Sequence, residues 1–197
     1  MFALFNVVLL LAGCSANWVG AIQSMWPAIQ AAVSAIFAFI GAVKSVPQSV
    51  KDAVTKVEAD VTASLQNAGT VLASLTQNAT ASVTSQFETV MQAIVTNLNS
   101  ILAGFSVTDP NTVSKVTELV NLAVAAIEAI LALVPVLSSK LAEHASEEEL
   151  KVADKVATTT IKNTHKVLQS SYHTIVSTPT GEVDVDEALA ALPQQLP

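Results

Sequence analysis

An eleven-residue spacing of apolar residues runs through the middle of the 197-residue chain. The repeating positions are Val50, Val61, Leu72, Val83, Ile94 and Phe105, and four of them are followed four residues later by Val54, Leu65, Phe87 and Leu98. Eleven residues fill three helical turns, so such a stripe stays on one face of an α-helix. The sequence therefore predicts a long helix over residues 47–103, with Pro47 in its first turn. We expect it to be unbroken or to break at Asn67–Gly69, because glycine destabilises a helix interior by up to about 1 kcal/mol relative to alanine.

A second helix is expected over residues 111–143. Thr108 or Asp109 is placed to cap it, and Pro110 suits its first position. The centre of this helix is apolar almost all round, and Glu128 is its only charge there. Because a carboxylate in the middle of a membrane span is costly, we favour a buried core helix.

A third helix is expected over residues 147–177. Ser146 and Glu149 have the spacing of a capping box, in which each residue hydrogen-bonds the backbone N–H of the other. The remaining residues, 178–197, are acidic and only weakly helical in pattern. We interpret them as a flexible tail or a docking peptide.

The fold class that follows is all-α. Long amphipathic helices are expected to form an antiparallel bundle or coiled coil, with a hydrophobic helix at the N-terminus. Matching lengths are typical of antiparallel neighbours in a bundle, and three segments match in this way: residues 70–103, 111–143 and 147–177. We therefore assign residues 47–177 to one helical bundle.

The segment Asn17–Val43 carries no charge over 27 residues, which is long enough to cross a bilayer. Its bulky apolar residues nevertheless recur at steps of four and three, as in an amphipathic helix: Ile22, Trp26, Ile29, Val33, Ile36, Ile40 and Val43. Two interpretations of residues 14–46 stay open, a membrane-associated helix and a buried helix of the bundle.

Charged residues make up only 13% of the chain, against about 25% in typical globular domains. Between Val61 and Ser114 the only charges are Glu88 and Asp109. A helix exposed on several sides would need more charge to stay soluble. We expect these faces to be covered by other helices of the chain, by further copies of it, by a helical protein partner or by a membrane interface.

The chain offers no chemistry that points to an enzyme. It has a formal net charge of −7 and no arginine among its nine positive residues, which argues against nucleic-acid binding. The three histidines, His144, His165 and His173, lack the i, i+3 or i, i+4 spacing of helical metal ligands. Because there is also no glycine-rich phosphate loop and no nucleophile elbow, we expect no catalytic residue, metal or cofactor.

The only cysteine, Cys14, follows an apolar run, Met1–Leu11, and the small pair Ala12-Gly13. The run is too short to span a bilayer and has the form of a secretory signal. Leu11 to Cys14 resembles the lipobox of bacterial lipoprotein signal peptides. The resemblance implies that residues 1–13 are removed as a signal peptide and that Cys14 is acylated. It also implies a location in the cell envelope, with most of the chain periplasmic or extracellular.

The function that we predict is non-enzymatic. The protein would be a membrane-anchored helical bundle, a structural or interaction module of the cell envelope held to lipid through Cys14 and, if they span, through residues 17–43. Two alternatives remain. One is an α-helical protein that perturbs membranes or forms pores, and the other is a subunit of a phage or envelope helical assembly.

Overall fold

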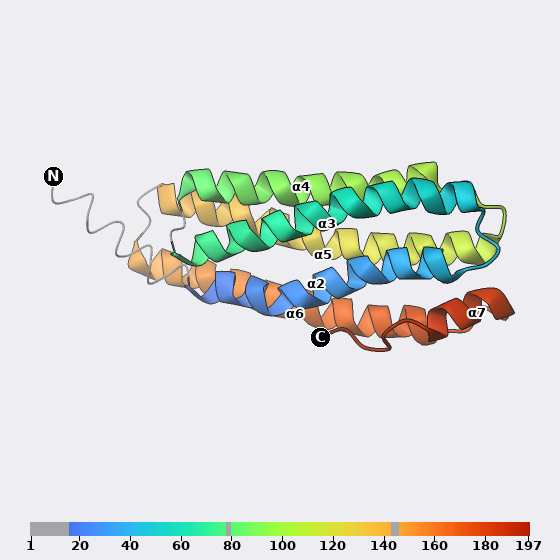
Figure 1. The fold of residues 1–197 in the computed structure, drawn as a ribbon. Helices are drawn as coiled ribbons and strands as arrows, with labels where there is room; N and C mark the ends of the chain where they lie inside the picture. Colours follow the sequence, from blue (N-terminus) through green and yellow to red (C-terminus); the bar gives the residue numbers. More distant parts are fainter. Residues whose placement is uncertain (1–15, 78–79, 143–145) are drawn as a thin grey trace.

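The computed structural model describes residues 16–77, 80–142 and 146–197. These residues form helices and contain no strand, so the expected all-α class is confirmed (Figure 1). The helices are α2 (Ala16–Ala42), α3 (Gln48–Gln77), α4 (Ala81–Gly104), α5 (Pro110–Ala142), α6 (Glu147–Ser177) and α7 (Val183–Ala190).

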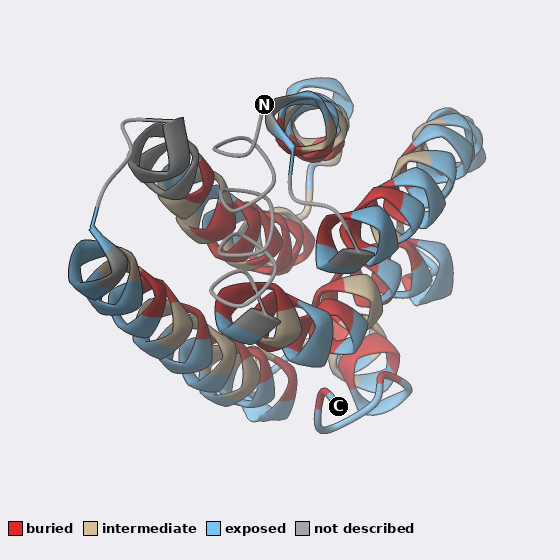
Figure 2. Ribbon diagram, turned by 90° about the vertical axis from the view of Figure 1, so that its left-hand side faces the viewer, coloured by how far each residue is buried: buried red, intermediate tan, exposed pale blue. Residues whose placement is uncertain are grey.

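Five long helices run side by side, and successive helices point in opposite directions along the bundle (Figure 1). Helix α2 packs against α3, α5 and α6, and its far end also contacts α7. Helix α3 packs on α4, α4 on α5, and α5 on α6. Viewed end on, the buried residues of each helix face the middle of the bundle (Figure 2). The bundle is thus larger than the three helices expected, because α2 and α3 belong to the same core.

Helix α2 uses its predicted apolar stripe as a core face. All seven stripe residues are buried, and Trp26 is the most exposed of them at 7%. On the other side of the helix Gln23 and Ser34 are exposed. Helix α2 is therefore a buried helix of the bundle, which was one of the two interpretations left open for this segment. By length and composition it also meets the requirements of a membrane span over Asn17–Ala42, as does α5 over Pro110–Val134.

The eleven-residue stripe faces the core, but the single long helix expected to carry it is wrong. Three stripe residues are buried, Val61, Leu72 and Ile94, and three are partly buried against the core, Val50, Val83 and Phe105. Helix α3 ends at Gln77, and α4 begins at Ala81 and packs along α3. The Thr80 hydroxyl caps α4 by accepting a hydrogen bond from the Val83 N–H at 3.3 Å. This cap satisfies one of the N–H groups that a new helix leaves unpaired, so the chain can fold back.

The expected break at Asn67–Gly69 is wrong, because α3 continues through it. A Cβ atom at Gly69 would lie 3.4 Å from Nε1 of Trp26. This distance is an ordinary van der Waals contact, so the packing of α3 on the Trp26 indole does not require a glycine at this position.

The expected helix starts are confirmed at α5 and α6. Asp109 caps α5: its carboxylate accepts hydrogen bonds from the hydroxyl and the backbone N–H of Thr112, and these hold the pKa of Asp109 below its ordinary value. At α6, Ser146 and Glu149 form the complete capping box. Helix α5 is less buried than expected, since Glu128 and its neighbours Ala125 and Ala132 are exposed.

Residues 178–197 differ from the expected flexible tail. They form α7 and a return segment that lies against α6 and the far end of α2 (Figure 1). Five apolar side chains of this region are buried in the same core: Val185, Ala188, Leu189, Leu192 and Leu196. Their burial stabilises the docked arrangement and outweighs the acidic character of the segment.

Candidate functional site

The N-terminal end of α2 is held by a carboxylate of α6. Asp154 is 8% exposed, and its two oxygens accept hydrogen bonds from the Asn17 side-chain amide at 2.9 Å and from the Trp18 N–H at 3.1 Å. The Trp18 N–H is one of the first N–H groups of α2, which have no partner inside the helix. The negative charge of Asp154 also lies at the positive end of the α2 dipole. Asp154 thus fixes the start of α2, 136 residues earlier in the chain, to α6.

The other end of α2 is held by α7 and α3. The Asp184 carboxylate accepts hydrogen bonds from the Lys44 and Ser45 N–H groups at 2.9 and 2.8 Å, and these bonds lower the pKa of Asp184. The Lys44 ammonium pairs with Glu187 at 2.8 Å, which raises the pKa of Lys44. Lys51 donates a hydrogen bond to a carbonyl in the last turn of α2. Both ends of α2 are therefore fixed by groups outside it.

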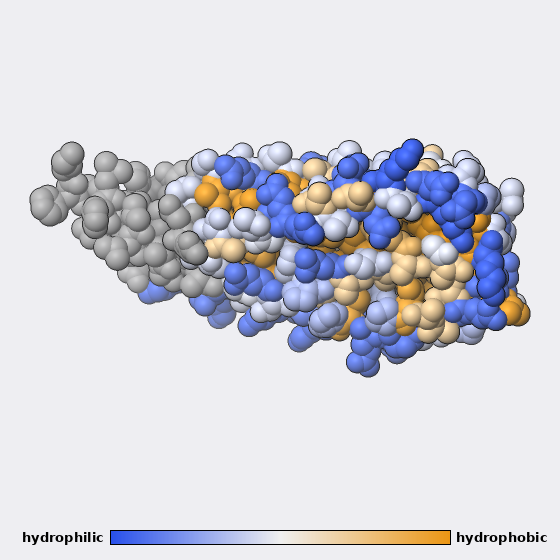
Figure 3. All heavy atoms as spheres, in the orientation of Figure 1, coloured by the Kyte–Doolittle hydropathy of each residue, from blue (hydrophilic) through white to orange (hydrophobic). Residues whose placement is uncertain are grey.

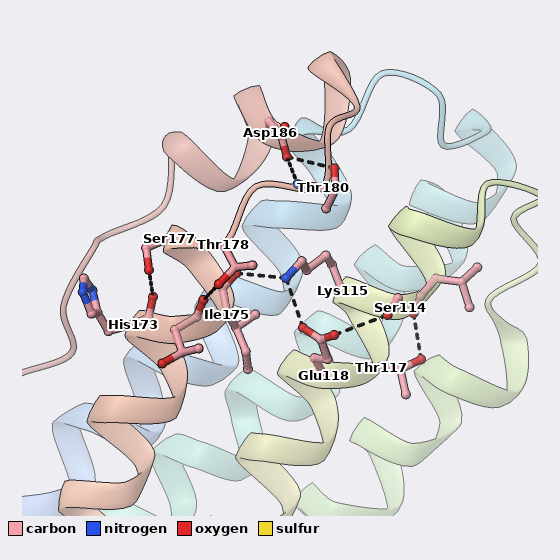
Figure 4. A network of polar contacts seen from close by, with 12 residues as sticks. Ser114, Lys115, Thr117, Glu118, His173, Ile175, Ser177, Thr178, Thr180 and Asp186 are labelled. Atoms are coloured by element: carbon pink, nitrogen blue, oxygen red, sulfur yellow. Dashed lines mark hydrogen bonds and ion pairs between the residues drawn. The ribbon is translucent and has the colours of Figure 1, made fainter.

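A lysine joins α5 to the end of α6 (Figure 4). Lys115 is buried, and its Nζ donates to the carboxylate of Glu118 and to the Ile175 carbonyl, both at 3.2 Å. That carbonyl is among the last of α6, which lack N–H partners and carry the negative end of the helix dipole. A cavity of about 460 Å³ adjoins these groups. Because each of them is already paired, we interpret the arrangement as a helix cap contributed by another helix.

Two of the three histidines hold the C-terminal segment. A ring nitrogen of His165 lies 3.1 Å from the Pro197 carbonyl oxygen, and one of His173 lies 3.0 Å from that of Gln194. Gln169, between them on α6, also donates to the Pro197 oxygen at 3.0 Å. His144 lies outside the described residues. Over residues 16–77, 80–142 and 146–197, no group of three or more histidine, cysteine or acidic side chains could hold a metal ion.

Cys14, the expected lipidation site, also lies outside the described residues. The first described helix begins two residues after it, at Ala16. Comparisons with protein families, with curated proteins and with solved structures found no match. The interpretation of this protein therefore depends on its own residues.

The bundle has two shallow grooves beside α6. The groove between α2 and α6 has a volume of about 600 Å³, and polar residues line much of it, Lys155, Lys162 and His165 among them. The groove between α5 and α6 has a volume of about 380 Å³ and is mostly apolar, with Leu122, Val167 and Leu168 in its wall. On the face drawn in Figure 3, hydrophilic side chains interrupt the apolar surface.

The outer face of α6 carries a row of exposed valines that was not expected from the sequence. Val152, Val156 and Val167 are 57–58% exposed, although valine is usually buried. Only one other large apolar side chain in the described part of the chain, Val183, is as exposed. The valines are spaced four and eleven residues apart, as in the stripe of α3 and α4. This spacing is visible in the sequence, but it does not tell which side of α6 is buried and which is exposed.

Proposed function

We propose that this protein is a membrane-anchored helical bundle that acts as a structural or interaction module of a bacterial cell envelope, without enzymatic activity. Acylation of Cys14 would supply the anchor. The bundle would lie on the periplasmic or extracellular side and present its helical faces to further copies or to a helical protein partner.

The observation that carries this proposal is the connection between Cys14 and the bundle. Residues 1–13 would be removed, so only Ser15 would separate the acylated residue from Ala16, where α2 begins. Asn17 and Trp18 are then fixed to α6 through Asp154. A lipid on Cys14 would therefore hold the folded bundle close to the membrane surface, since only Ser15 would lie between the acylated residue and α2.

Mass spectrometry of the mature N-terminal peptide tests the proposal. After expression in a bacterium that processes lipoproteins, we expect the first residue to be Cys14 with diacylglycerol attached. The Cys14→Ser variant should keep residues 1–13 and lose the acyl mass. An unprocessed wild-type N-terminus with a free Cys14 thiol would refute the anchor.

A second candidate function, membrane perturbation, is supported by the two helices of span length in one bundle, α2 and α5. To enter a bilayer, α2 would have to give up the hydrogen bonds at both of its ends. Vesicles filled with a self-quenching dye test this: leakage on addition of the protein would support it. Leakage should then increase when Asp154→Ala frees the start of α2.

A further inference from the structure

The lysines of α6 form a second row beside its exposed valines. Four of the nine lysines of the chain lie within the sixteen residues 151–166. Each comes directly before a residue on the side of the exposed valines, where Asn163 stands between Val156 and Val167; the four pairs are Lys151-Val152, Lys155-Val156, Lys162-Asn163 and Lys166-Val167. At about 100° per residue, each row stays within about 60° of the helix circumference. One long face of α6 thus carries four lysines along one side and three valines with Asn163 along the other, and it begins directly after the exposed Glu148 and Glu149.

This face is open in the bundle. Helix α6 packs on α2 and α5, and the C-terminal segment lies against the second half of α6 through His165 and His173. His173 continues the lysine row, so the open part of this face ends before it. Val152, Asn163 and Lys166 are exposed. The apolar row continues into the groove between α5 and α6, which Val167 helps to line. The result is a straight strip of about 24 Å, at 1.5 Å per residue. On its basic side Lys155 and Lys162 also line the groove between α2 and α6.

We propose that this face of α6 lies on the surface of a bilayer that contains anionic lipids. Lysines that flank shallow apolar side chains are typical of helices that bind in the plane of the membrane interface, because the ammonium groups contact lipid phosphates while the apolar groups enter the headgroup region. The chain as a whole carries a formal charge of −7, so an anionic surface attracts this face and repels the rest.

The basic and apolar face begins at the end of the bundle where the proposed lipid anchor, Cys14, would lie. The orientation of the bundle on the membrane therefore rests on the proposed function. Asp154, which lies between the first two lysine–valine pairs, bonds Asn17 three residues after Cys14. An acyl chain at Cys14 and the beginning of the lysine row would therefore reach the membrane at the same end of the bundle. An antiparallel two-fold pairing of copies with α6 against α6 is disfavoured, because it would bring the two lysine rows together.

Binding to vesicles tests the charge requirement. We would use the full chain with Cys14→Ser, and vesicles of phosphatidylcholine with or without phosphatidylglycerol. Lys166→Gln should weaken binding to the anionic vesicles about fivefold, and Lys155→Gln with Lys166→Gln about 25-fold. Lys56→Gln on α3 is the matched control, since Lys56 is also exposed but lies outside the face. Equal effects of the Lys56 and Lys166 changes would contradict the proposal.

A fluorescent probe tests whether the face itself touches lipid. In the Cys14→Ser background, Asn163→Cys places the only thiol within the apolar row, and Thr62→Cys places it on the exposed side of α3. A polarity-sensitive dye at 163 should shift to the blue with anionic vesicles and not with neutral ones, whereas the dye at 62 should shift with neither. If the dye at 163 shows no blue shift on vesicles that bind the protein, the proposal is overturned. It is also overturned if the dye shifts without lipid as the protein concentration rises, because the face would then contact a second copy. Neither result alters the acyl mass on Cys14, so the two proposals fail separately.

Discussion

Helices α2 and α5 both have the length and composition of a membrane span, yet the bundle uses them differently. The apolar window of α5 has the higher mean hydropathy, 1.9 against 1.6, but only 44% of it is buried, against 61% in α2. Both helices have three long neighbours: α3, α5 and α6 pack on α2, and α2, α4 and α6 pack on α5. Helix α2 is in addition hydrogen-bonded at both ends by groups outside it. Helix α5 keeps an outer side with Asn121, Ala125 and Glu128 exposed. Mean hydropathy therefore does not decide how deeply each helix is buried.

The largest difference between the two helices is expected from truncating a large side chain. Phe39 of α2 is fully buried, whereas Leu122 of α5 is half-buried beside the groove. Phe39→Ala leaves a cavity and should lower the free energy of unfolding by about 3–5 kcal/mol. Leu122→Ala should cost clearly less, because the remaining space is open to solvent. Urea unfolding followed by circular dichroism measures both, and equal losses would mean that α2 is not the better packed helix.

The cap at the start of α2 gives the next effect. Asp154→Ala leaves the Trp18 N–H and the Asn17 amide without their acceptor, and we expect a loss of about 1–3 kcal/mol. Asp154→Asn keeps one acceptor oxygen and should lose less. Glu128→Ala on α5 serves as the control, because Glu128 is exposed and should leave the unfolding midpoint almost unchanged. If Asp154→Ala had as little effect as Glu128→Ala, the contact with α6 would not hold α2 in place.

Lys115 provides a smaller test on the side of α5. Lys115→Met keeps the apolar stem but removes the hydrogen bond to the Ile175 carbonyl, so we expect a loss of about 1 kcal/mol. Hydrogen exchange should localise the change to the last turn of α6. Protection that falls instead across all of α5 would show that Lys115 mainly supports packing of its own helix.

The local patterns were readable in the sequence because each depends on residues close together in the chain. The stripe of α2 and the capping box of α6 follow from spacings of three and four residues. The Asp154 contact could not be found in this way. Nothing in the sequence around Asp154 distinguishes it from an ordinary surface carboxylate on a helix that also carries lysines. Its partner, the Trp18 N–H, lies 136 residues away in the chain.

The turn between α3 and α4 shows a second limit of local patterns. The eleven-residue stripe continues across it, from Leu72 to Val83, so periodicity alone predicts a single rod. Folding back lets the two halves of the stripe bury each other, with Leu65 and Leu98 both in the core. This burial arises only when two separate segments pack together, so spacing within one segment does not predict it. Gly69 suggested a break in the wrong place, whereas the capping residue Thr80 marks where α4 begins.

The smallest effect is expected where α7 holds the far end of α2, and it should depend on pH. Hydrogen bonds from the Lys44 and Ser45 N–H groups lower the pKa of Asp184, and a bond from the Thr180 N–H lowers that of Asp186 in the same segment. A carboxyl group whose pKa is lower in the folded than in the unfolded state stabilises the fold above its unfolded value of about 3.9. That contribution is lost as the pH falls below about 4 and through the folded pKa values.

Acid should therefore loosen α7 and the end of α2 before it unfolds the apolar core. The measurement is hydrogen exchange of the Lys44 and Ser45 amides, corrected for intrinsic rates, between neutral pH and about pH 3, a window set by the aspartate pKa. Protection of these two amides should fall while that of the α2 interior persists, and Asp184→Asn should remove most of the pH dependence. The start of α2 gives the internal comparison within the same helix. If both ends lost protection together on acidification, the two ends of α2 would be coupled through the whole bundle rather than held by separate local contacts.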